Sequence, residues 1–172
     1  MEKPFEKAYW VVPGLFLAGD YPGRPEESDS LRRVQALLRI GIREVVDLTQ
    51  QGESFMPYAP LLVKEAEEYA MDCSHRSFPI KDFGLPTRED VIEILDHIDR
   101  QITARRPVYL HCMGGIGRTG TIVGCWLARH GIDGLAVLEE LKRLRADTPN
   151  WYHSSPETDA QRKLVEGWKK GE

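Results

Sequence analysis

Apolar residues recur along the chain with two periods, which predict strands alternating with helices. Short runs rich in β-branched and aromatic residues predict strands at 10–18, 42–48, 77–80 and 107–111, the first divided in two by the turn Pro13-Gly14. Apolar residues three and four positions apart predict helices at 31–38, 61–72, 87–102, 119–130, 135–144 and 155–168. Such alternation is typical of an α/β fold, a mostly parallel sheet covered by helices.

Polar residues at the helix ends support this assignment. Ser28 or Ser30 is placed to cap the first helix, and Thr87 with Asp90 three positions later forms a capping pair for the third. Pro156, within Ser-Pro-Glu, is typical of a first helical turn and predicts that the last helix begins there. The predicted apolar face of that helix contains Ala160, Leu164 and Trp168.

The length of the chain predicts a single domain over residues 1–172. A chain of 172 residues is the size of one ordinary domain, and no repeat or linker interrupts it. No run of eighteen apolar residues is present, so we expect no membrane span. The amino terminus carries charges without an apolar stretch, which argues against a secretory signal.

Charge and cysteine content narrow the class of protein further. The chain has 23 Lys and Arg residues against 27 Asp and Glu residues. It therefore lacks the excess of basic residues that is typical of proteins that bind nucleic acid. The three cysteines are too few and scattered for a disulfide framework, which favours a reducing cytoplasm.

The segment between the strand at 107–111 and the helix at 119–130 carries the chemistry. Glycines at 114, 115 and 117 let the backbone approach a ligand closely, and a loop that opens a helix points its amides at one anion. Arg118 adds a planar fork for two phosphate oxygens. These groups favour the thiolate form of Cys112, which makes it a candidate nucleophile for phosphoryl transfer.

Three other interpretations of this segment are weaker. Gly115-x-Gly117-x-x-Gly120 matches a dinucleotide-binding pattern, but the acidic residue expected about twenty positions later falls inside a predicted helix. A Walker A loop needs Gly at Cys112 and Lys at Arg118. The third is a glycine-rich turn around an inert cysteine.

These residues resemble the cysteine-based protein tyrosine phosphatases of the small dual-specificity type. The family pattern His-Cys-x5-Arg-Ser/Thr is matched by residues 111–119, and residues 13–17 resemble its entry strands. Residues 78–86, called here the acid loop, are similar to the mobile loop of the cyclin-dependent-kinase-associated and Cdc14-like branch. The resemblance implies a three-layer fold with a central, mostly parallel sheet.

The resemblance also implies roles for individual residues. Cys112 attacks phosphorus, Arg118 holds the phosphoryl oxygens, and Asp82 protonates the leaving group. Thr119 donates a hydrogen bond to the Cys112 sulfur, and His111 orders the loop from behind. The amides that hold phosphate belong to Met113, Gly114, Gly115, Ile116, Gly117 and Arg118.

Three further assignments stay open at this stage. Gln161 resembles the glutamine that places the hydrolytic water, although an exposed helical glutamine is the simpler interpretation. Cys73 is a resolving thiol or a small buried side chain. For the general acid, Asp90 already has a capping role and Asp72 lies at a predicted helix end.

The expected activity is hydrolysis of phosphotyrosine in proteins, and the same activity could extend to phosphoserine and phosphothreonine. The alternatives are a phosphatase of a small molecule, nucleotide or inositol phosphate, a phosphate-binding module without activity, and a thiol redox protein. The chemistry calls for no cofactor and no metal, and the five histidines lack ligand spacing. We expect a cytoplasmic monomer whose partner is a phosphoprotein substrate.

Overall fold

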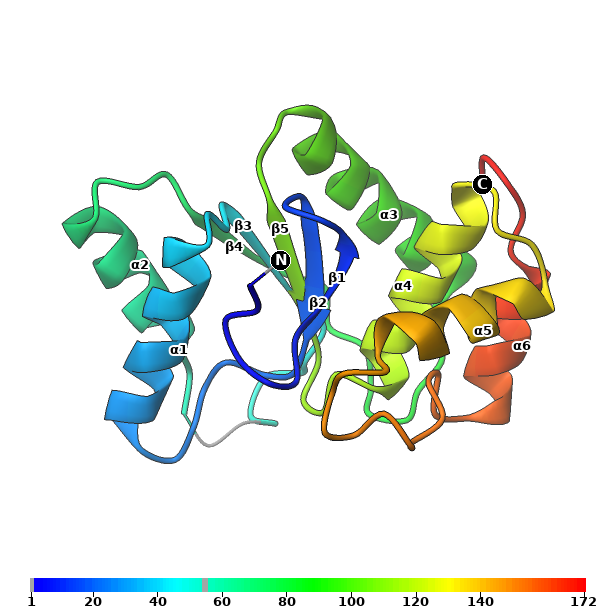
Figure 1. The fold of residues 1–172 in the computed structure, drawn as a ribbon, viewed down its shortest axis with the longest axis horizontal. Helices are drawn as coiled ribbons and strands as arrows, with labels where there is room; N and C mark the ends of the chain where they lie inside the picture. The colour runs from blue at the N-terminus through cyan, green and yellow to red at the C-terminus, as the bar shows by residue number, and fades with distance from the viewer. Residues whose placement is uncertain (1, 54–55) are drawn as a thin grey trace.

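The computed structural model describes residues 2–53 and 56–172, whose strands form one sheet in the order β1-β2-β5-β3-β4 (Figure 1). β1 (Tyr9–Val12) pairs antiparallel with β2 (Phe16–Gly19). β2, β5 (Val108–His111), β3 (Glu44–Asp47) and β4 (Ser74–Ser77) pair in parallel. The predicted α/β class with a mostly parallel sheet is therefore confirmed.

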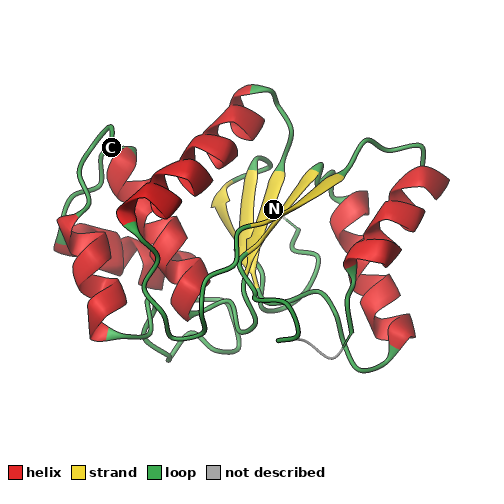
Figure 2. Cartoon of the chain, turned by 180° about the vertical axis from the view of Figure 1, so that it is seen from behind, coloured by secondary structure: helices red, strands yellow, loops and turns green. Residues whose placement is uncertain are grey.

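Helices cover both faces of the sheet, which gives the expected three layers (Figure 2). Their bounds are Glu27–Arg39 for α1, Ala59–Glu68 for α2, Arg88–Thr103 for α3, Gly117–Arg129 for α4, Leu135–Leu144 for α5 and Asp159–Gly167 for α6. α1 and α2 lie on one side, and α3 to α6 lie on the other (Figures 1 and 2). In the described part of the chain, no helix is long and apolar enough to cross a membrane.

The core divides into two clusters because side chains alternate across the strands. Along β5, Val108 and Leu110 pack toward α3 and α4, whereas Tyr109 packs toward α1 and α2. β3 follows the same rule, with Val46 on the first side and Val45 on the second. Both faces of the central strands β3 and β5 are buried, so apolar residues can follow one another along these strands without alternation.

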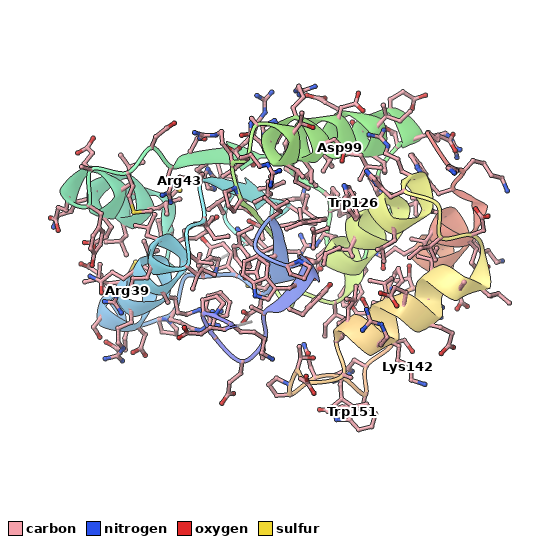
Figure 3. The ribbon with its side chains drawn as sticks, turned by 45° about the horizontal axis from the view of Figure 1, so that its top comes forward. Arg39, Arg43, Asp99, Trp126, Lys142 and Trp151 are labelled. Carbon is pink, nitrogen blue, oxygen red and sulfur yellow. The ribbon has the colours of Figure 1, made fainter. Side chains whose placement is uncertain are left out.

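The helix that follows the candidate loop is tied to its neighbour by polar contacts. Trp126 of α4 lies beside Asp99 of α3 (Figure 3), and its Nε1 donates to Asp99 Oδ1 at 2.8 Å. Arg129 donates to the same carboxylate at 3.1 Å. These contacts help to hold α4, and therefore the loop that leads into it, in place.

The predicted position of β4 is wrong by three residues. The strand covers Ser74–Ser77 and not 77–80, because its parallel register with β3 pairs Glu44 with Ser74 and Asp47 with Ser77. β4 is an edge strand, so its largely exposed side chains need no apolar pattern. The apolar signal came from Phe78 and Ile80, which pack on the core just after the strand.

The last helix begins later than predicted. α6 starts at Asp159 because Thr158, not the segment around Pro156, supplies the N-cap, and Gln161 completes a capping box. Its buried face consequently contains Gln161 and Val165, whereas Ala160 is exposed. Trp168 is buried as predicted, although it lies just beyond the helix.

Of the predicted N-caps, that of α3 is confirmed and that of α1 is wrong. Thr87 accepts from the Asp90 N–H at 3.1 Å, and the Asp90 carboxylate accepts from the Thr87 N–H at 3.2 Å. In α1 the N-cap is Glu26, without a side-chain bond, and Ser30 lies inside the helix. Its hydroxyl instead accepts from the Arg24 N–H at 2.7 Å.

Glycines on one face of α4 let the carboxyl-terminal segment approach closely. A Cβ at Gly124 would lie 2.7 Å from Val165 Cγ1 of α6 and 3.3 Å from Leu141 Cδ1 of α5. A Cβ at Gly120 would lie 2.1 Å from Ser155 Oγ. Gly120, which belongs to the pattern that imitates a dinucleotide-binding site, therefore has a role in close packing.

We predict that Gly124→Ala lowers the free energy of unfolding by roughly 1–3 kcal/mol, the usual cost of overpacking. Val165 is fully buried and β-branched, so it cannot move aside without strain. Gly167→Ala is the matched control, because a Cβ there meets nothing within 4 Å. Urea unfolding checks both variants, and equal stability of Gly124→Ala and wild type would contradict the packing described.

Candidate active site

The candidate loop connects β5 to α4 at the carboxyl edge of the sheet. Residues 112–118, called here the phosphate loop, lie beside the segments that follow β2, β3 and β4, because parallel strands end at one edge. Gly115 has a φ of +71°, and a Cβ there would lie 2.6 Å from the Gly19 carbonyl carbon. Glycine is therefore required at this point by both conformation and space.

The carbonyl groups of the phosphate loop are held by donors outside it. The Tyr21 N–H donates to Met113 O at 3.1 Å, Ser155 Oγ to Ile116 O at 2.8 Å, and the Asn150 amide to Gly114 O at 3.5 Å. In a trans peptide the carbonyl and the following N–H point in opposite directions. Carbonyls held outward thus leave the next amides facing inward, as an anion-binding nest requires.

A pocket of about 190 Å³ lies against this loop. It is lined by Asp82, Phe83, Cys112, Met113, Gly114, Ile116, Gly117, Arg118 and Glu157. Cys112 is only 2% exposed, so its thiol is reached through this pocket. The predicted nucleophile and cationic residue, both on the phosphate loop, are consequently brought together with the predicted acid, which lies on the acid loop.

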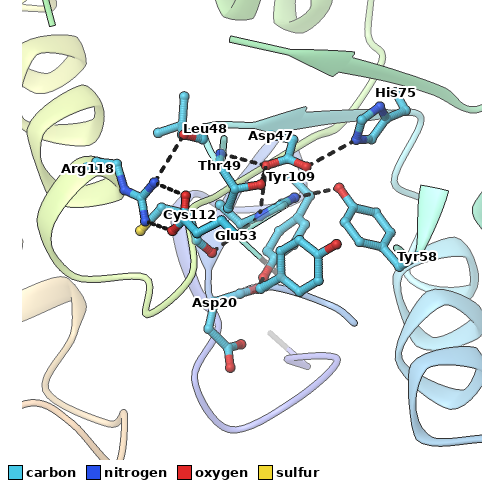
Figure 4. A network of polar contacts seen from close by, with 12 residues as sticks. Asp20, Asp47, Leu48, Thr49, Glu53, Tyr58, His75, Tyr109, Cys112 and Arg118 are labelled. Atoms are coloured by element: carbon cyan, nitrogen blue, oxygen red, sulfur yellow. Dashed lines mark hydrogen bonds and ion pairs between the residues drawn. The ribbon is translucent and has the colours of Figure 1, made fainter. Parts of the chain in front are cut away.

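Arg118 is buried and held from several sides. Its Nη1 donates to Ile80 O at 3.0 Å, and its two terminal nitrogens pair with the two carboxylate oxygens of Glu53 (Figure 4). Burial lowers the pKa of the guanidinium, but the hydrogen bond to Glu53 and nearby anionic groups outweigh this and raise it. The side chain is therefore a permanently charged, fixed fork.

Glu53 is a site residue that the sequence analysis missed. It follows β3 in a polar, turn-rich connection, where an acidic residue gives no signal of its own. Its hydrogen bond to Arg118 holds the pKa of its carboxyl below the usual range. The clue available was the position of Glu53 after β3, because the connection that follows β3 starts at the same edge of the sheet as the phosphate loop.

Asp82 reaches the pocket from a tight turn in the acid loop. The Gly84 N–H donates to Lys81 O at 2.7 Å, and Phe83 between them has a left-handed φ of +56°. Asp82 Oδ1 lies 3.0 Å from Arg118 Nη2, while about half of the side chain stays exposed. Glu157, just before α6, is a second carboxyl at the pocket that was not predicted.

His111, the last residue of β5, is fully buried next to the phosphate loop. The Tyr58 hydroxyl is 2.5 Å from its Nε2, and its Nδ1 is 3.3 Å from the Cys112 carbonyl oxygen. Burial lowers the pKa of His111 to about 4, although Asp47 nearby opposes this. The ring is thus neutral near pH 7, with Nδ1 donating to the loop and Nε2 accepting from Tyr58.

Thr119 and Gln161 occupy different surroundings. Thr119 Oγ1 is buried, and the described residues offer it no hydrogen-bonding partner, so its predicted bond to Cys112 stays a prediction. Gln161 is fully buried, which contradicts the interpretation as an exposed helical residue. Its amide bonds to the acid loop at Gly84 O and to the backbone at the start of α6.

The other two cysteines are poorly suited to redox chemistry. Burial raises the pKa of Cys73 to about 12 and that of Cys125 to about 12. Both thiols are free, and Cys125 packs in the core as predicted. Among residues 2–53 and 56–172, no group of three or more His, Cys, Asp or Glu side chains is placed to hold a metal ion.

A known protein family matches most of this chain. Residues 22–132 match the family described as "Tc-R-P: Polymorphic toxin system, DSP-PTPase phosphatase". The chain belongs to this family. The resemblance to the cysteine-based protein tyrosine phosphatases of dual-specificity type, drawn from residues 111–119, is thereby confirmed.

Individual relatives agree with this assignment. An uncharacterized protein, MJECL20 of Methanocaldococcus jannaschii, is 39% identical over 69 residues, which are 40% of this chain and 47% of the relative. A putative tyrosine phosphatase, 067L of Invertebrate iridescent virus 3, is 29% identical over 93% of this chain and 64% of its own length. The matches thus span less than two thirds of either relative.

The fold is also that of solved phosphatases. The crystal structure of Tk-PTP in the active form superposes with a TM-score of 0.69 at 26% identity, covering 95% of this chain and 96% of that one.

We predict that acid destabilises the fold through His111. The unfolded histidine binds a proton below about pH 6.5, and the folded one only below about 4. Between these values the unfolded state holds more protons, so His111 lowers the free energy of unfolding as the pH falls, by at most about 1.4 kcal/mol per pH unit. Urea unfolding at pH 7 and pH 5 measures the slope.

His111→Asn should flatten that slope, and the exposed His153→Asn should not. A slope that is the same in wild type and His111→Asn would show that another group causes it.

Proposed function

We propose that this chain is a phosphatase that hydrolyses phosphomonoesters through a phosphocysteine intermediate, with phosphotyrosine in proteins as its substrate. The observation that carries the proposal is the meeting of Cys112, Arg118 and Asp82 at one small pocket lined by the phosphate loop. Family membership and the match of residues 111–119 to the dual-specificity pattern support it. The partner is then the phosphorylated protein itself.

In the first step the Cys112 thiolate attacks phosphorus, forming an S–P bond as the bond to the leaving oxygen breaks. The three equatorial oxygens keep their charge throughout, so the amides of 113–118 and the Arg118 fork stabilise the transition state. Glu53 and Ile80 hold that fork rigid before the substrate arrives. The Arg118 side chain then needs less reorganisation as the transition state forms.

The leaving oxygen accepts a proton from Asp82, which lies at the pocket and remains partly exposed to solvent. In the second step water attacks phosphorus, the S–P bond breaks, and inorganic phosphate and the Cys112 thiolate are released. Asp82, now ionised, accepts the proton of that water. Thr119 is assigned the hydrogen bond that eases departure of the sulfur.

Two features favour an aromatic phosphate ester as the substrate. Phe83 lines the pocket and is 62% exposed, so its ring is free to contact a substrate ring. The residues between Cys112 and Arg118 include no lysine, whereas phosphatases of polyphosphorylated inositols place lysines there. The viral relative is itself described as a putative tyrosine phosphatase.

The nucleophile is tested by Cys112→Ser, which should abolish turnover while vanadate or phosphate still binds, because a hydroxyl does not ionise near neutral pH. Cys125→Ser, a core change of the same chemistry, is the control and should retain activity. Wild-type kcat/KM should be highest for phosphotyrosine peptides in a panel with nucleotides and inositol phosphates. Substantial turnover by Cys112→Ser would rule out the assignment.

The acid is tested by its dependence on the leaving group. Asp82→Asn should lose about 100-fold in kcat on phenyl phosphate, within the usual range for acid catalysis, and far less on a fluorinated coumarin phosphate, whose alcohol needs no proton. The alkaline limb of the pH profile should flatten. Asp72→Asn is the control, since that side chain is exposed and pairs with Arg106.

Equal losses of Asp82→Asn on both esters would place the acid elsewhere. Glu157, the other carboxyl at the pocket wall, would then be the next residue to change.

A further inference from the structure

We propose that Gln161 is a positioning residue for the general acid, tying the acid loop to the start of α6 beside the phosphate loop. The proposal rests on the proposed function, because it acts through Asp82. It assigns Gln161 to the step in which the leaving group departs. The resemblance to other phosphatases instead suggested placement of the hydrolytic water.

One end of the Gln161 amide holds the acid loop. Nε2 donates to Gly84 O at 2.9 Å, two residues beyond Asp82 and inside the same tight turn. Among the described residues, this bond and the Asp82–Arg118 pair are the polar contacts that join residues 81–86 to the rest of the protein. Phe83 and Leu85 are largely exposed and so contribute little packing, whereas Pro86, at the end of the segment, is buried.

The other end of the amide is fixed to the backbone. Oε1 accepts from the N–H groups of Glu157 and Thr158, each at 3.2 Å, which uses both of its lone pairs. A Cβ at Gly117 would lie 3.3 Å from Oε1, so the amide also packs against the last turn of the phosphate loop. Rotating the amide would break three hydrogen bonds in a buried site, where lost bonds are costly.

These contacts join the acid and the phosphate-binding amides in one frame. The Asp82–Arg118 pair holds the acid itself, and the buried Gln161 amide lies between Gly84 of the acid loop and Gly117 of the phosphate loop. Displacement by about 1 Å can cost roughly 100-fold in rate when a reacting group is misplaced. A residue that prevents such displacement has a large effect without touching the substrate.

The two candidate roles for Gln161 affect different kinetic constants. kcat/KM for a phosphatase of this mechanism reports events up to departure of the leaving group, and hydrolysis of phosphocysteine comes afterwards. Loss of the tie to Gly84 should therefore lower kcat/KM on a poor leaving group. Loss of a water-placing group should leave that constant unchanged and let phosphocysteine accumulate.

The test compares Gln161→Met and Gln161→Glu with wild type on phenyl phosphate and on a fluorinated coumarin phosphate. Glu keeps an oxygen for the two backbone N–H groups but has no N–H for Gly84, and Met avoids an added charge. We expect kcat/KM on phenyl phosphate to fall roughly 10- to 100-fold in both variants. The loss on the coumarin ester should be much smaller, and the alkaline limb of the pH profile should flatten.

Thr158→Ala is the matched control. It removes the other half of the capping box, the hydroxyl that accepts from the Gln161 N–H at 3.2 Å, and leaves the bond to Gly84. It should lower Tm and keep kcat/KM near the wild-type value. In an Asp82→Asn background, Gln161→Met should cause no further loss, because both changes remove the same contribution.

Three results would overturn the proposal. An unchanged kcat/KM on phenyl phosphate with accumulating phosphocysteine would assign Gln161 to water placement. A loss shared equally by Thr158→Ala would reduce its role to helix stability, and independent losses in the double variant would show that it does not act through Asp82.

Failure of this proposal can be told from failure of the proposed function. If Asp82→Asn alone lacks leaving-group dependence, the proposed function fails at its acid. If only the Gln161 variants lack that dependence, the role of Gln161 alone fails.

Discussion

The site depends on one constraint, which is that the peptide groups of the phosphate loop keep their carbonyls outward. Tyr21, Asn150 and Ser155 supply the donors that hold these carbonyls, from two segments, one that follows β2 and one that connects α5 to α6. Without them, the short loop could turn carbonyl oxygens toward an incoming anion and repel it. The packing of the carboxyl-terminal segment against α4 therefore serves the chemistry as well as the stability of the fold.

Charge at the pocket is balanced around a single guanidinium. Arg118 faces the carboxyls of Glu53 and Asp82, and Glu157 lies on the same pocket. A phosphate dianion entering this setting meets carboxylates as well as the cation, so inward-facing amides and the amino-terminal end of α4 must supply much of the attraction.

Much of the fold was predictable from local pattern. The sheet strands at β3 and β5, the helix at 135–144 and the Thr87–Asp90 capping box follow from periodicity and from side chains that bond to nearby backbone. One error lies where the partner is distant, because β4 takes its register from β3. Another error is local, because the capping box of Thr158 and Gln161 sets the start of α6 in place of the proline that commonly opens a helix.

The sequence by itself predicted the nucleophile Cys112 and the cationic fork of Arg118, because both lie in the continuous segment His111 to Thr119, whose residue types and spacing need no knowledge of the fold. Only the tertiary structure decided which residues surround them. Glu53 carries no local signal, since an acid in a turn is ordinary, and the sequence named Gln161 through a resemblance, without its contact to the acid loop. They acquire roles because the parallel strands end at one edge of the sheet and α6 lies beside that edge. Glu53 thereby meets Arg118, and Gln161 meets the acid loop at Gly84.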